Sequence, residues 1–110
     1  MATTYKVLGQ SQGTASVSTY SDLYTVPAST SSIVSTISVC NTASADATVR
    51  VAVAAGSTPA AAEWVVYDAT VAANDTLTLT LGITMEATKK LVISSSANTV
   101  SFSAFGSEIS

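Results

Sequence analysis

The alternation of apolar and hydroxyl-bearing residues is clearest between Asp75 and Met85. Threonine or glycine fills every second position there. The positions between them are apolar: Leu77, Leu79, Leu81, Ile83 and Met85. Because successive side chains of a β-strand point to opposite faces, this pattern predicts one half-buried strand with an apolar face and a hydroxyl face. A helix would scatter the same five apolar residues around its circumference.

Seven further segments have strand-like patterns and are separated by short polar turns. We predict strands at Thr4–Gln10, Tyr20–Val26, Ser32–Asn41, Ala47–Ala55, Glu63–Val71, Leu91–Ser94 and Val100–Ile109. Turn signals that recur about every ten residues, without a substantial helix, are typical of an all-β sandwich or barrel. We therefore predict one domain over residues 1–110, an antiparallel β-sandwich of about eight strands of jelly-roll or immunoglobulin-like type.

Local details of these strands can also be predicted. The short polar link between Ser32–Asn41 and Ala47–Ala55 favours a β-hairpin. Ile33, Ile37 and Val39 are expected to share one face of their strand. In the last strand the apolar alternation slips at Phe105 and Gly106, which predicts a β-bulge there.

Charge and composition narrow the classes of partner. Charged residues make up only 10% of the chain, and the net charge is −3, whereas a typical soluble domain has about 25% charged residues. Nucleic acids and anionic membranes both attract clusters of Lys and Arg, so neither is expected as a partner. No window approaches the ~20 apolar residues of a membrane span. A neutral surface rich in Ser, Thr and Ala suits contact with other proteins.

The residue types needed for catalysis or metal binding are scarce. The chain has no histidine, one cysteine and isolated glycines, so the common nucleophile–base pairs, Cys/His metal sites and Gly-rich phosphate loops are missing. Within a strand, Asp68 is expected to form an ion pair with Arg50 across the sheet. Six other carboxylates fall at predicted turns or strand ends: Asp22, Asp46, Glu63, Asp75, Glu86 and Glu108. We predict no enzyme, no catalytic, cofactor-binding or metal-binding residues, and no cofactor.

Three features have alternative interpretations. Cys40 lies in an apolar run and is expected in the core, with a reactive thiol as the alternative. The stretch Asn74–Thr76 fits an N-glycosylation acceptor but is interpreted as a turn. The larger aromatic residues are expected to be core or interface anchors, with a sugar-binding surface as the alternative. These aromatics are Tyr5, Tyr20, Tyr24, Trp64 and Tyr67.

The cellular compartment follows from the first residues and from the single cysteine. The segment Met1–Gln10 lacks a continuous apolar stretch, so we expect no signal peptide. One cysteine cannot form an internal disulfide, which agrees with synthesis and folding in a reducing cytoplasm.

A resemblance to a known group of proteins is carried by segments that together span the chain: Tyr5–Ser11, Asp22–Ala28, Val34–Ile37 with Val39–Asn41, Ala73–Thr76 with Leu81–Thr84, and Ser101–Ile109. Together they resemble small virion structural proteins of tailed bacteriophages, in particular of marine cyanobacterial viruses. None of them is a catalytic motif, and Ser57–Glu63 is the stretch expected to depart from the pattern as a variable loop. The resemblance implies a virion component, either a capsid decoration (cement) protein or a tail-associated piece, made in the host cytoplasm.

Two functions remain open at this point. The first is a structural protein that self-associates and binds the major capsid protein or tail proteins. Strands such as Ser32–Asn41 carry apolar groups on both faces, more than one sandwich interior can hold, and closed cyclic symmetry is the usual solution. A homotrimer is expected, with a dimer next. The alternative is a tail- or fibre-associated module that recognises a host-surface carbohydrate or receptor.

Overall fold

The computed structural model describes residues 2–110, so Met1, the first residue of the predicted domain, lies outside the described residues. The described chain is all-β, without a helix. Its nine strands are β1 (Thr3–Gln12), β2 (Ser21–Thr25), β3 (Ser31–Asn41), β4 (Ala47–Ala54), β5 (Trp64–Val71), β6 (Thr76–Leu79), β7 (Ile83–Met85), β8 (Lys90–Ser95) and β9 (Val100–Ile109). Each predicted strand is present, and β6 and β7 together replace one of them.

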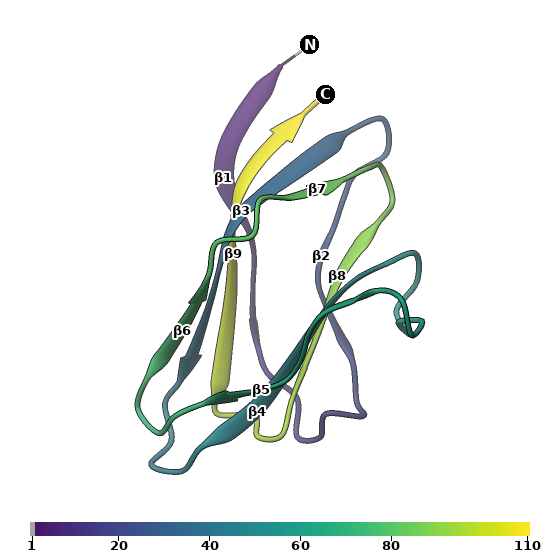
Figure 1. Ribbon diagram of the computed structural model, residues 1–110. Coiled ribbons are helices and arrows are strands. Elements are labelled where there is room, and N and C mark those ends of the chain that lie inside the picture. Colours follow the sequence, from purple (N-terminus) through teal and green to yellow (C-terminus); the bar gives the residue numbers. More distant parts are fainter. Residues whose placement is uncertain (1) are drawn as a thin grey trace.

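The nine strands form two antiparallel sheets packed face to face (Figure 1). Sheet A has the order β1-β9-β3-β6, and β7 pairs with the same edge of β3 as β6 does; sheet B has the order β2-β8-β4-β5. With β6 and β7 counted as one interrupted strand, the partners are nested: first with last, second with second-last, and so on inwards. This is the strand order of a jelly roll, so the predicted β-sandwich is confirmed and the jelly-roll form is the one adopted.

The predicted hairpin between the third and fourth strands is wrong. β3 lies in sheet A and β4 lies in sheet B, so the polar link between them crosses from one sheet to the other. The side chain of Asn41 holds this crossing in place: its amide donates to the carbonyls of Ala45 and Val71, at 2.8 and 3.2 Å. A short polar link is equally suited to a hairpin and to a corner of a sandwich, and only the pairing of the remaining strands distinguishes them.

The long strand predicted from Asp75 to Met85 is interrupted. Gly82 has a positive φ of 61°, a conformation that glycine adopts without strain, and the chain leaves the sheet at residues 80–82. Leu81 is therefore 47% exposed rather than buried. The other apolar residues of the stretch do face the core, with Met85 fully buried and Leu77, Leu79 and Ile83 partly buried against it.

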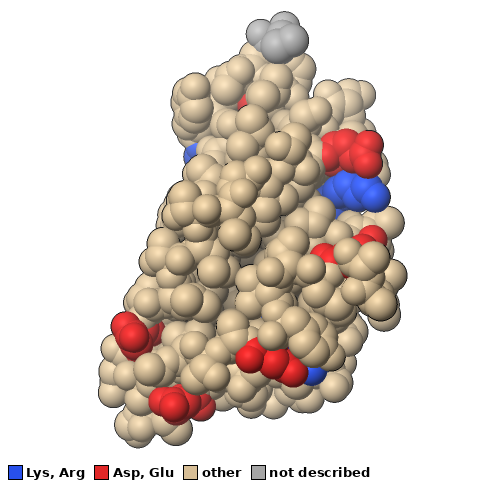
Figure 2. All heavy atoms as spheres, in the orientation of Figure 1, with Lys and Arg blue, Asp and Glu red and all other residues tan. Residues whose placement is uncertain are grey.

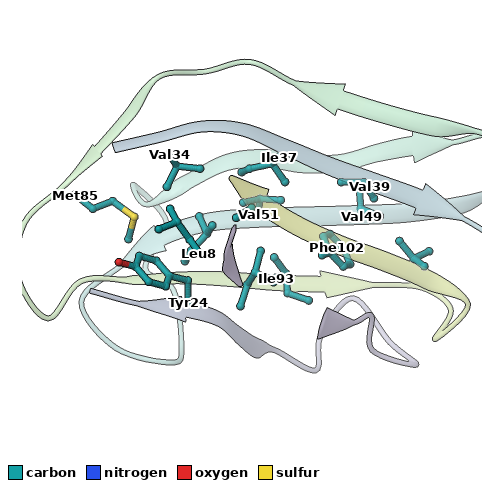
Figure 3. Packing of buried hydrophobic residues seen from close by; sticks show 14 of the residues in the cluster. Leu8, Tyr24, Val34, Ile37, Val39, Val49, Val51, Met85, Ile93 and Phe102 are labelled. Carbon is teal, nitrogen blue, oxygen red and sulfur yellow. The ribbon is translucent and has the colours of Figure 1, made fainter. Parts of the chain in front are cut away.

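The core lies between the inner faces of the two sheets. Phe102, the largest fully buried side chain, comes from β9 in the middle of sheet A. Figure 3 shows residues of the two sheets facing each other across this layer: Leu8, Val34, Ile37, Val39 and Phe102 from sheet A, and Val49, Val51 and Ile93 from sheet B. Alternation of apolar and polar residues in each strand explains why these side chains point inwards.

Irregular pairing surrounds Phe105, as predicted, but the extra residues belong to the neighbouring strands. Leu8 of β1 and Ser35 of β3 are the unpaired residues on either side of Phe105. Consequently Val34 faces the core while Ile33 faces outwards, which reverses the phase expected for Ile33. Gly106 is required beside this double bulge, because a Cβ there would overlap the backbone of β3.

A polar cluster joins the two sheets at one end of the core. The hydroxyl of Tyr24, on β2 of sheet B, contacts the Ser32 hydroxyl at 2.6 Å and donates a hydrogen bond to Glu108; both partners belong to sheet A. Lys6 lies 3.2 Å from the other carboxylate oxygen of Glu108. Burial first, and then the bond to Glu108, raises the pKa of Tyr24 to about 12. The bond from Tyr24 is the largest cause of a lowered pKa at Glu108.

Candidate interaction surfaces

The outer face of sheet A presents its side chains in rows that run across the strands. Two rows are polar and uncharged: Gln12, Ser101, Cys40 and Thr76, then Gln10, Ser103, Ser38 and Thr78. Two rows are richer in apolar groups: Val7, Phe105 and Thr36, then Tyr5, Ser107, Ile33 and Thr84. We call these fifteen residues the row face. None of them is charged.

The apolar half of the row face is unusually open. Tyr5 is 84% exposed, and Val7, Ile33 and Phe105 are between 36 and 46% exposed. These four residues line one shallow hollow, together with Lys6, Ser35, Gly106 and Ser107. Exposed large apolar groups that gather in one place, unlike scattered ones, mark sites of contact with another protein or a ligand.

Charged residues lie outside the row face. In the view of Figure 2 the Lys, Arg, Asp and Glu atoms form small separate patches, and most of the visible surface is uncharged. Lys6 and Glu108, the charges nearest to Tyr5 along β1 and β9, alternate with the row-face residues of their strands and so point to the inner side. An uncharged surface can be buried without desolvating ions.

At β4 and β8 the outer face of sheet B is covered by the chain itself. Ala52, Ala54, Val92 and Ser94 point to this face, yet all four are fully buried. A hydrogen bond from Arg50 to the carbonyl of Val17, at 3.4 Å, holds the connection between β1 and β2 on this side. The outward apolar groups of β4 and β8 are therefore covered within the chain, whereas the outer side of β3, the strand for which a second apolar face was expected above all, belongs to the row face.

An arginine–aromatic cluster lies on the same side, at the β4–β5 pair. Two residues of β5, Tyr67 and Asp68, bulge opposite Arg50, and Asp68 has a positive φ of 55°. This conformation brings the Asp68 carboxylate to 2.6 Å from Arg50, which confirms the predicted ion pair. The hydrogen bond to Asp68 also raises the pKa of Arg50. The guanidinium lies 4.1 Å from the ring centre of Tyr67, within cation–π range.

Two further aromatic rings complete this cluster. Trp64 meets Tyr67 nearly edge-on, with 5.3 Å between ring centres, and Tyr20 lies 5.7 Å from Trp64. Tyr67 is 57% exposed, whereas Trp64 and Tyr20 are partly buried. The sequence placed these aromatics in one category but gave no signal that they would meet, because Tyr20 lies in the loop before β2 whereas Trp64 and Tyr67 belong to β5.

The remaining candidate residues are separated. Cys40, predicted in the core, instead lies partly exposed on the row face, because it alternates with Val39, which faces the core. Tyr24 is an anchor in the core, as one of the two interpretations had it. Asn74 occupies a turn with a positive φ of 57°. Within residues 2–110 no three His, Cys, Asp or Glu side chains are grouped so that they could hold a metal ion.

Helices that could cross a membrane are absent from the described part of the chain.

Comparison with known proteins gives a fold but no family. No protein-family model matches the chain, and no curated protein matches it. A chain in the structure of infectious bursal disease virus, Gx strain, is 17% identical with a TM-score of 0.52, over 97% of this chain and 31% of that one. A chain in the crystal structure of the T13 particle of the same virus is 14% identical with a TM-score of 0.50, over 96% and 30%.

This chain thus spans about a third of the length of each of those two chains. At such low identity the likeness shows a shared fold. It places the jelly roll described above among folds found in the chains of virus particles.

Proposed function

We propose that this protein is a non-enzymatic structural component of a virion, most specifically a capsid decoration (cement) protein of a tailed bacteriophage that self-associates and stabilises the shell. The observation that carries the proposal is the row face, an uncharged side of sheet A with an exposed apolar half. The shared fold with chains of virus particles supports a virion role. The phage origin rests on the sequence resemblance alone.

The size of the row face is adequate for stable docking. Four strands at ~4.8 Å spacing and about ten residues at ~3.3 Å rise give a face of roughly 19 by 33 Å, or about 600 Å². Two such faces in contact would bury about 1,200 Å², the lower limit for specific protein interfaces. The hydroxyl groups of the polar rows can replace their hydrogen bonds to water by hydrogen bonds to a partner. Burial removes the apolar half from water, which stabilises the complex.

The proposal specifies partners and assembly. The chain acts as one domain over residues 1–110, without a cofactor, and binds its own copies together with the major capsid protein or tail proteins. The assembly expected from the sequence is a homotrimer at a local three-fold position of the shell, with a dimer next. Synthesis takes place in the host cytoplasm, and neither nucleic acid nor membrane is a partner.

A charge placed on the row face tests this proposal. Thr78→Lys puts a cation on the exposed end of a polar row, whereas Thr70→Lys makes the same change at an exposed position of β5 in sheet B. Co-sedimentation with purified capsids should weaken for Thr78→Lys and remain at the wild-type level for Thr70→Lys. Failure of the wild-type protein to sediment with capsids, or equal loss in both variants, would reject docking through the row face.

Location on the particle separates decoration from a tail function. Immunogold labelling of intact virions should place the protein over the capsid shell at many sites per particle. Gold confined to the tail would overturn the decoration role and favour the second candidate below, and unlabelled virions would reject both.

The second candidate function is recognition of a host-surface carbohydrate or receptor by a tail- or fibre-associated module. The exposed Tyr67 ring beside Trp64, with Arg50 and Asp68 next to them, offers an apolar ring and fixed polar groups of the kind that hold sugars. Trp64 is the only tryptophan, so its fluorescence reports directly on this cluster. Titration with host-surface glycans should change that fluorescence, and Tyr67→Ala should abolish the response; an unchanged signal would reject the candidate.

A further inference from the structure

The N-terminal half of β1 forms an open edge of sheet A. All residues from Thr3 to Val7 are exposed, on both faces of the strand. Figure 1 shows β1 and the end of β9 extending together past the rest of the sandwich. β9 pairs with one side of β1, and in the described chain no strand pairs with its other side. β2 approaches β1 at Gly9, where an added Cβ would meet the Leu23 carbonyl.

The direction of each backbone group on this edge follows from the pairing with β9. Ala2 and Ser110 exchange both of their backbone hydrogen bonds, at 3.0 and 2.9 Å. In an antiparallel ladder such pairs alternate with pairs that make no bonds to each other. With the register Thr3 opposite Ile109 and Tyr5 opposite Ser107, the N–H and C=O groups of Thr3 and Tyr5 point away from β9, towards solvent.

We propose that this edge pairs with the same edge of a second copy of the chain. In the antiparallel arrangement, Thr3 of each copy lies opposite Tyr5 of the other. The outward N–H and C=O groups of both residues then make four backbone hydrogen bonds around a two-fold axis. The two A sheets become one continuous sheet, and their row faces join at the Tyr5 side chains.

The partner strand belongs to a second copy of the chain, because the outward backbone donors and acceptors of this edge match those of an identical edge. The same four groups supply donors and acceptors in matching positions, as an isologous two-fold contact requires. In this register Thr4 faces Thr4 and Lys6 faces Ala2, so the two lysines are not opposed. Each Lys6 is also paired with Glu108 of its own chain at 3.2 Å. Natural edge strands are usually protected by proline, bulges or several charges, and Lys6 is the single charge between Thr3 and Val7.

This inference does not depend on the proposed virion role. A two-fold contact makes a dimer by itself, and if trimers form through another surface it links trimers to one another. An edge that instead accepts an extended segment of a different protein would leave the isolated chain without this contact.

Proline substitution tests the contact through the backbone. Tyr5→Pro removes an N–H that the isolated chain does not use, and proline is tolerated on an edge strand where the N–H faces solvent. Tyr5→Ala removes the same ring but keeps the N–H. Because each copy loses one N–H donor, Tyr5→Pro removes two backbone hydrogen bonds from the dimer. At roughly fivefold per hydrogen bond, the dissociation constant measured by sedimentation equilibrium should rise at least tenfold. Tyr5→Ala should change it by less than about threefold, since its bonds remain.

Native-state amide exchange by NMR supplies an independent readout. Amides of Thr3 and Tyr5 should become protected as wild-type concentration rises, whereas those of Thr4 and Lys6 should be protected at every concentration because they bond to β9. If Tyr5→Pro lowers the melting temperature of the isolated chain, Thr3→Pro, at the other outward N–H, replaces it. A wild-type mass of one chain or three chains across the micromolar range overturns the inference, as does equal association of the proline and alanine variants.

Discussion

Tyr24→Phe removes a single hydroxyl from the cluster that joins the two sheets. The ring, which is 8% exposed, keeps its packing, so the change isolates the hydrogen bonds to Ser32 and Glu108. Loss of a bond to a charged group and of one to a buried hydroxyl is expected to lower the free energy of unfolding by about 1–3 kcal/mol at neutral pH.

The pH dependence gives this prediction its sign. Tyr24 has a pKa of about 12 in the folded protein and 10.0 as its ordinary value, so its contribution is complete below pH 10 and is lost as the pH rises towards 12. At about 1.36 kcal/mol per pKa unit, the wild-type protein should lose up to about 2.7 kcal/mol over this range relative to Tyr24→Phe. On the acid side, the lowered pKa of Glu108 stabilises the fold above the carboxyl's ordinary pKa. This stabilisation by Glu108 is lost as the pH falls through the pKa that its carboxyl has in the folded protein.

Urea titrations between pH 3 and pH 12 measure both effects. Tyr5→Phe is the matched control: the Tyr5 ring is 84% exposed, so this change should leave the free energy of unfolding unaltered on both the acid and the alkaline side. The stability difference between wild type and Tyr24→Phe should be widest between pH 7 and 9 and should close near pH 12. Parallel pH profiles of the two proteins would refute the coupling between the Tyr24 hydroxyl and Glu108.

Three shorter predictions test the core, the double bulge and the strand interruption. Phe102→Ala should cost about 3–5 kcal/mol in urea unfolding, because Phe102 is fully buried, while Phe105→Ala should cost less than about 2 kcal/mol. Gly106→Ala should lower the melting temperature because its Cβ overlaps β3, whereas Gly56→Ala meets open space and should be neutral or slightly stabilising; equal effects would contradict the bulge geometry. Leu81→Ser should change stability by less than about 0.5 kcal/mol, and a large loss would mean that the predicted continuous strand forms.

Strand positions were predictable because each strand has its own alternation. The ion pair of Arg50 with Asp68 was also predicted, because the two opposite charges lie in predicted strands that could pair across a sheet. The slip at Phe105 and Gly106 likewise indicated the place of the irregular pairing, although the extra residues lie in the neighbouring strands β1 and β3. These features depend on residues close together in the sequence or on one simple period.

Features that depend on distant segments escaped prediction. The link after Asn41 was interpreted as a hairpin, because nothing near it shows that β3 pairs with β9 and β6 instead. The outward phase of Ile33 is set by the bulge at Ser35 in the pairing of β3 with β9. The meeting of Tyr20 with Trp64 similarly requires the whole roll to be formed.

The nested pairing of the strands has a consequence for how the chain is made. Within residues 2–110 only β4 and β5 are neighbours both along the chain and within a sheet, so a local hairpin can form there first, on a microsecond scale of about 1–10 μs. Of the nine strands, β1 is synthesised first and its partner β9 last, so Thr3 cannot pair with Ile109 until β9 has been made. β9 also separates β1 from β3. A chain that stops before Val100 therefore exposes two strand edges at once, and such unpaired edges are where aggregation begins.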